Sequence, residues 1–216
     1  MERAKSMKIG IVGAGHLGST LARHFAKAGH LVALSNSRGP ASLARLVESI
    51  GPSARAETVD GAAAFAELVV LAVPWRNPKA LPSPARVAGK IVIDAMNAYS
   101  AEGEILDLGE KSSSEEVAQR LPGARLVKAF NTLYYHTLAV EARQSNQLVV
   151  FVAGDDADAK ARVSRLIGDI GFAPLDTGSL RDGGRKQQPG SAIYNRPMTI
   201  SEARAALGLL QAGEAP

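Results

Sequence analysis

The sequence contains no cysteine among its 216 residues. This absence excludes a disulfide scaffold, a thiol nucleophile and thiolate metal sites. Long hydrophobic runs are also missing. The longest clear run covers residues 68–73 and stops at Pro74, whereas a membrane-spanning helix needs roughly 18 apolar residues. We therefore expect no membrane partner.

Aromatic residues make up only 5% of the chain, which argues against a stacking platform for single-stranded nucleic acid. Charge of one sign is not concentrated either. The chain has 25 basic and 21 acidic residues, a net charge of +4, and no long block of like charges. We interpret this as a solvated mixed surface with no nucleic-acid partner, although a small phosphorylated ligand is compatible with it.

The composition that remains is that of a globular protein, with 46% apolar and 21% charged residues. At roughly 150 residues per domain, the length predicts one domain with a small appendage. Residues 1–6 are polar and precede no apolar segment of the kind found in secretory signals. We expect a cytoplasmic protein.

From Lys8 onward, short apolar runs alternate with segments of helical periodicity. Strands are predicted at residues 8–12, 31–34, 54–57, 68–73, 90–94, 126–130, 148–153 and 172–176. Helices are predicted at residues 17–28, 41–50, 59–67, 114–121 with Ser114 as the N-cap, 156–170 and 201–210. This order predicts an α/β fold with a Rossmann-type, doubly wound, mostly parallel sheet.

The pattern weakens near the C-terminus, where glycines and prolines interrupt a polar segment. We assign residues 7–180 to the Rossmann-type domain and residues 181–216 to a C-terminal tail with a short helix. The tail is interpreted as an arm, at a dimer interface or over the active site, rather than as a core element.

A glycine motif directly follows the first predicted strand and opens the first helix. It matches GxGxxG and consists of Gly13, Ala14, Gly15, His16, Leu17 and Gly18. In this context the first glycine permits the tight turn, the second lets a pyrophosphate approach the backbone, and the third allows the helix to pack on the strand. The helix N-terminus then attracts the phosphates. The motif predicts dinucleotide binding.

The loop after the second strand indicates which dinucleotide binds. An NAD site usually carries an acidic residue there, whereas this chain has Asn36, Ser37 and Arg38. The first two can donate hydrogen bonds, and the guanidinium of Arg38 suits a 2′-phosphate. Arg45 is better explained as a surface residue of the following helix. We therefore predict a preference for NADP(H).

Polar or aromatic residues follow several later strands, where ligands bind in doubly wound sheets. Trp75, the only tryptophan, could flank a planar ring or fill the edge of the core. Asn97 and Asn131 could orient a nicotinamide amide or hold their own turns. His136 could act as a general acid, but a structural or surface role is favoured.

No metal site is predicted. Asp155, Asp156 and Asp158 begin a helix, so capping explains them, and the four histidines are scattered. No catalytic residue is identified.

The combination of motifs resembles the NADPH-dependent reductases of the deazaflavin coenzyme F-420. The residues that carry the resemblance lie at 8–34, 36–38, 73–75, 127–132, 153–156 and 175–178. The resemblance covers roughly residues 8–180. The wider family also includes the reductase domain of membrane ferric reductases and is similar to the N-terminal part of pyrroline-carboxylate reductases.

The resemblance implies a Rossmann fold that binds NADP(H) and positions it for hydride transfer to a deazaflavin or similar flavin-like acceptor. Residues 14–17 would then meet the pyrophosphate, and Ser37 and Arg38 the 2′-phosphate. The implied nicotinamide region consists of Val73, Pro74, Trp75, Met96, Asn97 and Ala129. A homodimer is expected from the frequency of dimers among such reductases.

The chain departs from the family pattern in its polar segment 181–196 and around Asn131, so the acceptor stays open. Two alternatives are kept. One is an NADPH-dependent reductase of a small imine or carbonyl compound, with His136 or a tail tyrosine as proton donor. The other is a non-catalytic NADP(H)-binding sensor. The tail residues of most interest are Tyr194, Asn195, Arg196 and Met198.

Overall fold

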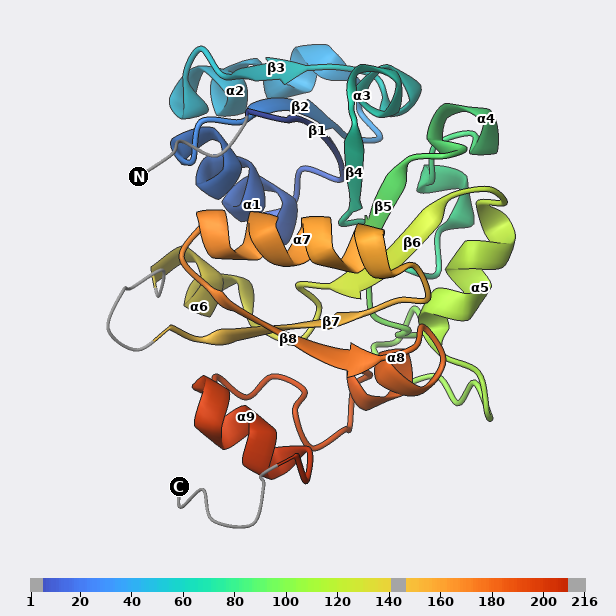
Figure 1. Ribbon diagram of the computed structural model, residues 1–216. Coiled ribbons are helices and arrows are strands. Elements are labelled where there is room, and N and C mark those ends of the chain that lie inside the picture. Colours follow the sequence, from blue (N-terminus) through green and yellow to red (C-terminus); the bar gives the residue numbers. More distant parts are fainter. Residues whose placement is uncertain (1–5, 141–146, 210–216) are drawn as a thin grey trace.

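The computed structural model describes residues 6–140 and 147–209. Its strands are β1 (Lys8–Val12), β2 (Leu31–Ser35), β3 (Ala54–Ala56), β4 (Leu68–Leu71), β5 (Ile91–Asp94), β6 (Arg125–Ala129), β7 (Val149–Ala153) and β8 (Ala173–Gly178). They form one sheet in the order β3-β2-β1-β4-β5-β6-β7-β8. All neighbouring strands are parallel except β6 and β7 (Figure 1).

The α-helices are α1 (His16–Lys27), α2 (Ala44–Ile50), α3 (Val59–Phe65), α4 (Pro84–Val87), α5 (Ser113–Arg120), α6 (Tyr135–Val140), α7 (Ala157–Asp169), α8 (Asp182–Lys186) and α9 (Ile200–Ala206). Two 3-10 helices, η1 (Pro40–Leu43) and η2 (Pro78–Ala80), complete the described elements. Within the described ranges, no helix is both long and apolar enough to cross a bilayer.

The sheet is covered on both faces, which explains why its central strands are continuous apolar runs. Helices α1, α6 and α7 pack on one face, around Phe25, Phe130 and Val163. Helices α3, α4 and α5 pack on the other face, around Ala63, Val87 and Val117. Since β2 and β4 flank β1 on opposite sides, the chain reverses its winding there. A crevice at such a reversal is the usual ligand site of doubly wound sheets.

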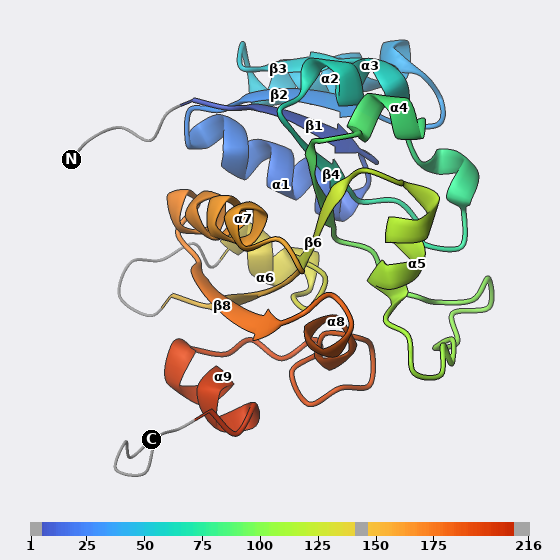
Figure 2. The same ribbon diagram turned by 45° about the vertical axis from the view of Figure 1, so that its right-hand side comes forward.

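The C-terminal segment completes the second face of the sheet over β7. Ile193, Met198 and Ala203 are almost wholly buried and pack against Val149 and Phe151. Figure 2 shows α9 beside the β7–β8 end of the sheet. The interpretation of the tail as lying outside the core is therefore wrong for these residues. They were missed because single apolar residues in a polar segment form no periodic pattern.

The predicted strands and most predicted helices are confirmed, with shifts at their ends. The assignment of Ser114 as the N-cap of α5 is wrong. The N-cap is Ser112, whose Oγ accepts from the Glu115 backbone N–H at 3.1 Å, while the Glu115 carboxylate accepts from the Ser112 backbone N–H at 2.6 Å. This reciprocal capping box begins the helix one residue early. Ser114 instead donates to Asp94. The short helices α4, α6 and α8 were not predicted.

Candidate functional site

The three glycines of the turn between β1 and α1 differ in how much space surrounds them. Gly13 has a φ of +107°, and a Cβ atom there would overlap the carbonyl of Ala72. A Cβ on Gly18 would overlap the carbonyl of Gly13. A Cβ on Gly15, by contrast, would meet no atom within 4 Å. Packing therefore explains Gly13 and Gly18 but not Gly15, whose backbone faces open space beside the turn.

The N-terminus of α1 opens on the same space. Its N-cap is Gly15, and within the described part of the chain no side chain caps the helix and no acidic residue lies in its first turn. The first N–H groups of a helix carry a partial positive charge and need external partners. The turn thus fits a pyrophosphate, as the sequence predicts.

The loop after β2 is preorganised by Asn36. Its Oδ1 accepts from the Arg38 backbone N–H at 3.0 Å, and its Nδ2 donates to Ser42 Oγ at 2.9 Å. Ser37 and Arg38 are exposed. Among the residues that the structure describes, the Arg38 guanidinium forms no ion pair. Asn36 shapes the loop, and Ser37 and Arg38 are left accessible for a phosphate.

A pocket of about 340 Å³ begins at Leu17, beside the glycine turn. We call it the tyrosine pocket, because all four tyrosines of the chain line it. Its lining residues are Leu17, Ala95, Asn97, Tyr99, Phe130, Asn131, Leu133, Tyr134, Tyr135, Tyr194 and Asn195. A larger groove of about 690 Å³ between residues 105–109 and α8 contains none of the glycine-turn residues. The tyrosine pocket is therefore the better candidate site.

Backbone strain is concentrated in this pocket. In the described ranges, Phe130 and Asn195 are the non-glycine residues with positive φ, at 64° and 53°. Both line the tyrosine pocket. Such conformations cost on the order of 1–3 kcal/mol each and cluster at functional sites. The strain supports a functional rather than a purely structural role for this region.

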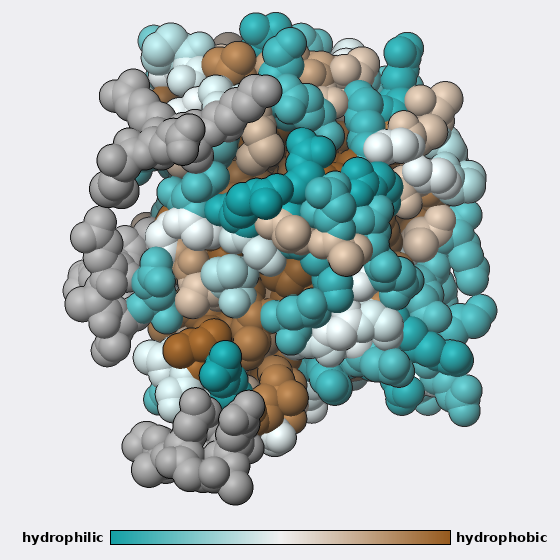
Figure 3. Space-filling view, viewed as in Figure 1, coloured by the Kyte–Doolittle hydropathy of each residue, from teal (hydrophilic) through white to brown (hydrophobic). Residues whose placement is uncertain are grey.

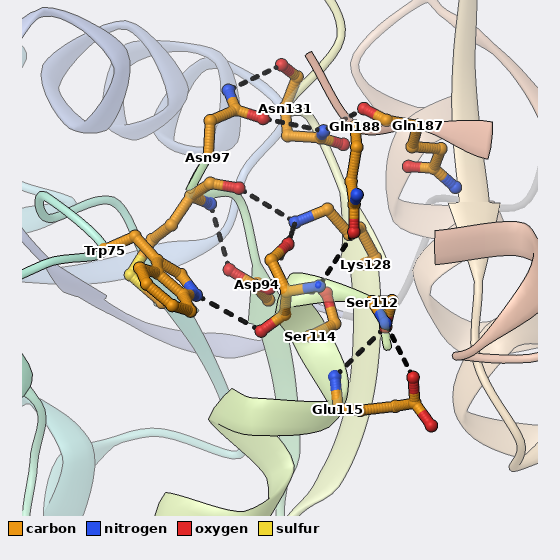
Figure 4. Close-up of polar contacts among 12 residues, drawn as sticks. Trp75, Asp94, Asn97, Ser112, Ser114, Glu115, Lys128, Asn131, Gln187 and Gln188 are labelled. Atoms are coloured by element: carbon orange, nitrogen blue, oxygen red, sulfur yellow. Dashed lines mark hydrogen bonds and ion pairs between the residues drawn. The ribbon is translucent and has the colours of Figure 1, made fainter. Parts of the chain in front are cut away.

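Asn97 and Asn131 face each other across the ends of β5 and β6. Asn131 Nδ2 donates to Asn97 Oδ1, and Asn97 Nδ2 donates to the Asn131 backbone carbonyl, both at 3.0 Å (Figure 4). Asn131 Nδ2 also donates to the Gln187 backbone carbonyl at 2.7 Å. These hydrogen bonds hold the two amides against each other and connect the tail, at Gln187, to the ends of β5 and β6.

Tyr194 reaches the amide pair from the tail. Its hydroxyl oxygen lies 3.3 Å from Asn97 Nδ2 and 3.1 Å from the Tyr99 hydroxyl. Burial is the main cause that raises the pKa of Tyr194 above its usual range. Its phenol, like that of an ordinary tyrosine, is protonated at neutral pH. Of the tail residues singled out in the sequence, Tyr194 and Asn195 line the pocket, whereas Arg196 is exposed and Met198 is buried in the core.

A buried ion pair supports the turn that carries Asn97. Lys128 Nζ lies 3.1 Å from Asp94 Oδ2 and donates to the Met96 carbonyl at 2.8 Å and to Ser113 Oγ at 3.2 Å (Figure 4). Asp94 also accepts from the Met96 backbone N–H at 3.0 Å. This network was not predicted, because a lysine in an apolar strand does not reveal its partner from the sequence.

Several predicted nicotinamide residues do not line the pocket. Trp75 is 8% exposed and its indole N–H donates to the Ser113 carbonyl at 3.2 Å, which favours the core alternative over contact with a ring. Met96 and Ala129 are buried in the core. Val73 lies beside Gly13, and Pro74 is exposed after β4.

Of the two histidines considered for the site, His16 contacts a residue of the pocket lining, whereas His136 does not line the pocket. The His16 ring stacks on Tyr135 with centroids 4.4 Å apart, which links the glycine turn to the wall of the tyrosine pocket. His136 is exposed on α6 and does not line the pocket. Of the two roles considered for His136, general acid or structural or surface residue, its exposure favours a surface residue. Within the described ranges, no group of three His, Asp or Glu side chains is placed to hold a metal ion.

Unpaired polar atoms gather where the tail meets β6. Among the described residues, Asn131 Oδ1, Thr132 Oγ1, Gln187 Oε1 and Ser191 Oγ are buried without a hydrogen-bond partner. Such atoms are rare in native proteins and need an explanation. Asn131 belongs to the pocket lining, and its Oδ1 is buried there without a hydrogen-bond partner among the described residues.

The fold and the site together define a dinucleotide-binding protein of the Rossmann class. Residues 8–98 match the model of a family described as "NADP oxidoreductase coenzyme F420-dependent". The chain belongs to this family of NADP oxidoreductases, with NADP(H) as the cofactor.

Three relatives illustrate the similarity. The hypothetical protein SMa0349 from Sinorhizobium meliloti is 36% identical with a TM-score of 0.80, over 89% of this chain and 95% of that one. A structure described as a candidate F420-dependent NADP-reductase from Arthrobacter sp. FB24 is 28% identical with a TM-score of 0.71, over 94% and 90% of the chains. The metalloreductase STEAP3 of Rattus norvegicus is 34% identical over 174 residues, which is 80% of this chain but only 34% of that protein.

Proposed function

We propose that the chain transfers hydride between NADPH and a flat conjugated acceptor of the deazaflavin or flavin type, bound in the tyrosine pocket. The observation that carries the proposal is the gathering of all four tyrosines and Phe130 in one pocket that begins at the glycine turn. Aromatic rings with polar tips suit a planar heteroaromatic ligand with polar edges. Family membership supports the cofactor.

In this proposal each part of the site has one task. The turn at Gly15 and the N-terminus of α1 hold the pyrophosphate. Ser37 and Arg38 bind the 2′-phosphate, and the paired amides of Asn97 and Asn131, which line the pocket, orient the nicotinamide amide. NADPH, when bound, supplies the hydride. The protein contributes orientation, which turns the meeting of the two reactants into an effectively unimolecular step.

The test is NADPH oxidation, followed at 340 nm, with coenzyme F420, FMN and riboflavin as acceptors. We expect turnover with at least one of them and much weaker turnover with NADH. Binding of NADPH without turnover of any acceptor would favour the sensor alternative instead.

A second candidate is reduction of a small imine or carbonyl compound. Tyr194 favours it, since its phenol lines the pocket and carries a proton of the kind that such a product needs. The same assay with cyclic imines and short ketones distinguishes the two candidates. Activity with these compounds alone would replace the deazaflavin proposal.

We also propose a homodimer, a cytoplasmic location, and a Rossmann domain of residues 7–180 followed by a segment, 181–216, whose residues Ile193, Met198 and Ala203 pack against β7. Hydrophobic surface gathers around α9, where Ile200 and Leu209 are 40% and 48% exposed (Figure 3). This surface supports a dimer. Sedimentation equilibrium of the purified protein, and of an Ile200→Glu variant, tests it.

A further inference from the structure

The tail holds Tyr194 in a fixed position within the tyrosine pocket. The Asn195 backbone N–H donates to the Thr132 carbonyl at 2.8 Å, and the Tyr194 backbone N–H donates to the Ser191 carbonyl at 3.2 Å. Asn195 has a φ of 53°, which turns the chain sharply after Tyr194. The tail therefore brings the phenol to the ends of β5 and β6 as part of a defined structure.

The orientation of Asn97 is set by its partner Asn131. Asn131 Nδ2 donates to the Asn97 side-chain oxygen, so the other end of the Asn97 amide must be the NH₂ group. That NH₂ group donates to the Tyr194 hydroxyl oxygen. One lone pair of Tyr194 is thereby occupied.

The second lone pair of Tyr194 is occupied by Tyr99, whose hydroxyl donates to it at 3.1 Å. A phenol hydroxyl has two acceptor sites and one proton to donate. With both acceptor sites filled, the Tyr194 proton is left without a partner in this network. The phenol lines the pocket, so an oxygen or nitrogen atom of a bound molecule can accept that proton.

We propose that Tyr194 donates a hydrogen bond to a carbonyl oxygen or ring nitrogen of the hydride acceptor. This rests on the proposed function and narrows its acceptor to a conjugated molecule with a hydrogen-bond-accepting edge. When such a molecule takes a hydride from NADPH, releasing NADP⁺, negative charge spreads to that edge until water supplies a proton. A fixed donor stabilises this charge more than the neutral ground state.

The experiment compares Tyr194→Phe, Tyr99→Phe and Tyr134→Phe. Tyr134 is the matched control, because it also lines the pocket but belongs to no hydrogen bond with Asn97. Two quantities are measured: the dissociation constant of oxidised F420 or FMN from the NADP⁺-loaded protein, by fluorescence quenching, and the single-turnover rate of NADPH oxidation.

For Tyr194→Phe we expect a 10- to 100-fold slower single turnover and about 3- to 10-fold weaker acceptor binding, with NADPH affinity within error of the wild type. Tyr99→Phe should show a smaller loss, since Tyr194 keeps its proton.

A loss in Tyr134→Phe as large as in Tyr194→Phe, or no loss in Tyr194→Phe, overturns the proposal. So does a larger loss in Tyr99→Phe, because Tyr99 would then carry the free proton. Failure of the wild-type protein to reduce any acceptor counts against the proposed function, whereas a selective change in acceptor binding would still support the donor role.

Discussion

Lys128 and Asp94 form an ion pair between β5 and β6 with 3.1 Å between Nζ and Oδ2, and neither side chain has any exposed surface. The pair lies under the turn that carries Met96 and Asn97. Lys128 donates to the Met96 carbonyl, and Asp94 accepts from the Met96 N–H. One buried charge pair thus binds both backbone polar groups of Met96, the residue before Asn97 in the tyrosine pocket.

Breaking this ion pair should lower the free energy of unfolding substantially. Lys128→Met leaves the Asp94 carboxylate buried without its cation, which typically costs about 3–5 kcal/mol of unfolding free energy. The control is Lys160→Met, which removes a partly exposed pair with Asp176 and should cost at most about 1 kcal/mol. Urea denaturation measures both. Similar losses in the two variants would contradict a special role for the buried pair.

Alanine substitutions at Gly15 and Gly18 should have opposite effects on stability and on NADPH binding. Gly15→Ala should keep the melting temperature, because its Cβ meets no protein atom, but should weaken NADPH binding where the pyrophosphate approaches. Gly18→Ala should lower the melting temperature, because its Cβ would overlap the Gly13 carbonyl. Differential scanning fluorimetry and calorimetric titration separate the effects. Unchanged NADPH affinity in Gly15→Ala would place the pyrophosphate elsewhere.

Arg38 should distinguish the two dinucleotides. Arg38→Ala removes a charged hydrogen bond worth about 1.5–3 kcal/mol, so NADPH binding should weaken by the corresponding factor while NADH binding changes little. Arg45→Ala removes the same charge from an exposed site nearby and serves as the control. Calorimetric titration of NADPH and of NADH into the wild type and both variants measures the dissociation constants. Equal losses for NADPH and NADH in Arg38→Ala would contradict the NADP assignment.

Stability should fall in mild acid. Burial is the main cause that lowers the pKa of His24 and His30 below 6.5. Below pH 6.5 the unfolded chain therefore binds more protons than the folded one, and the free energy of unfolding decreases as the pH drops. Asp156 and Glu202, whose pKa values are also lowered, add to this loss only below their ordinary values of 3.8 and 4.5.

Urea denaturation at intervals between pH 7.5 and 5.5 measures the effect. His30→Gln should flatten the dependence, whereas His136→Gln, at an exposed position, is the control. An unfolding free energy that is constant over this range, or that rises in acid, would show that these two histidines do not contribute as described.

Most of the sheet could be predicted from the sequence because strands buried on both faces, such as residues 68–71, are continuous apolar runs. The glycine turn and Arg38 were likewise predictable, since they depend on local sequence. The tyrosine pocket was not. Tyr99, Tyr135 and Tyr194 lie far apart in the chain and meet only in the folded protein. The same holds for Lys128 and Asp94, 34 residues apart. Trp75 was ambiguous because the residue type alone does not distinguish burial from ligand contact.

The central claim is hydride transfer from NADPH to a flat acceptor in the tyrosine pocket. The most direct measurement uses NADPH deuterated at C4 of the nicotinamide, incubated with the protein and oxidised coenzyme F420, with mass spectrometry of the reduced acceptor. The account predicts one deuterium per molecule of reduced acceptor, and markedly less product with Gly15→Ala. The account is contradicted if the reduced acceptor contains no deuterium, whichever of the two C4 hydrogens of NADPH has been replaced. It is also contradicted if no NADPH is consumed.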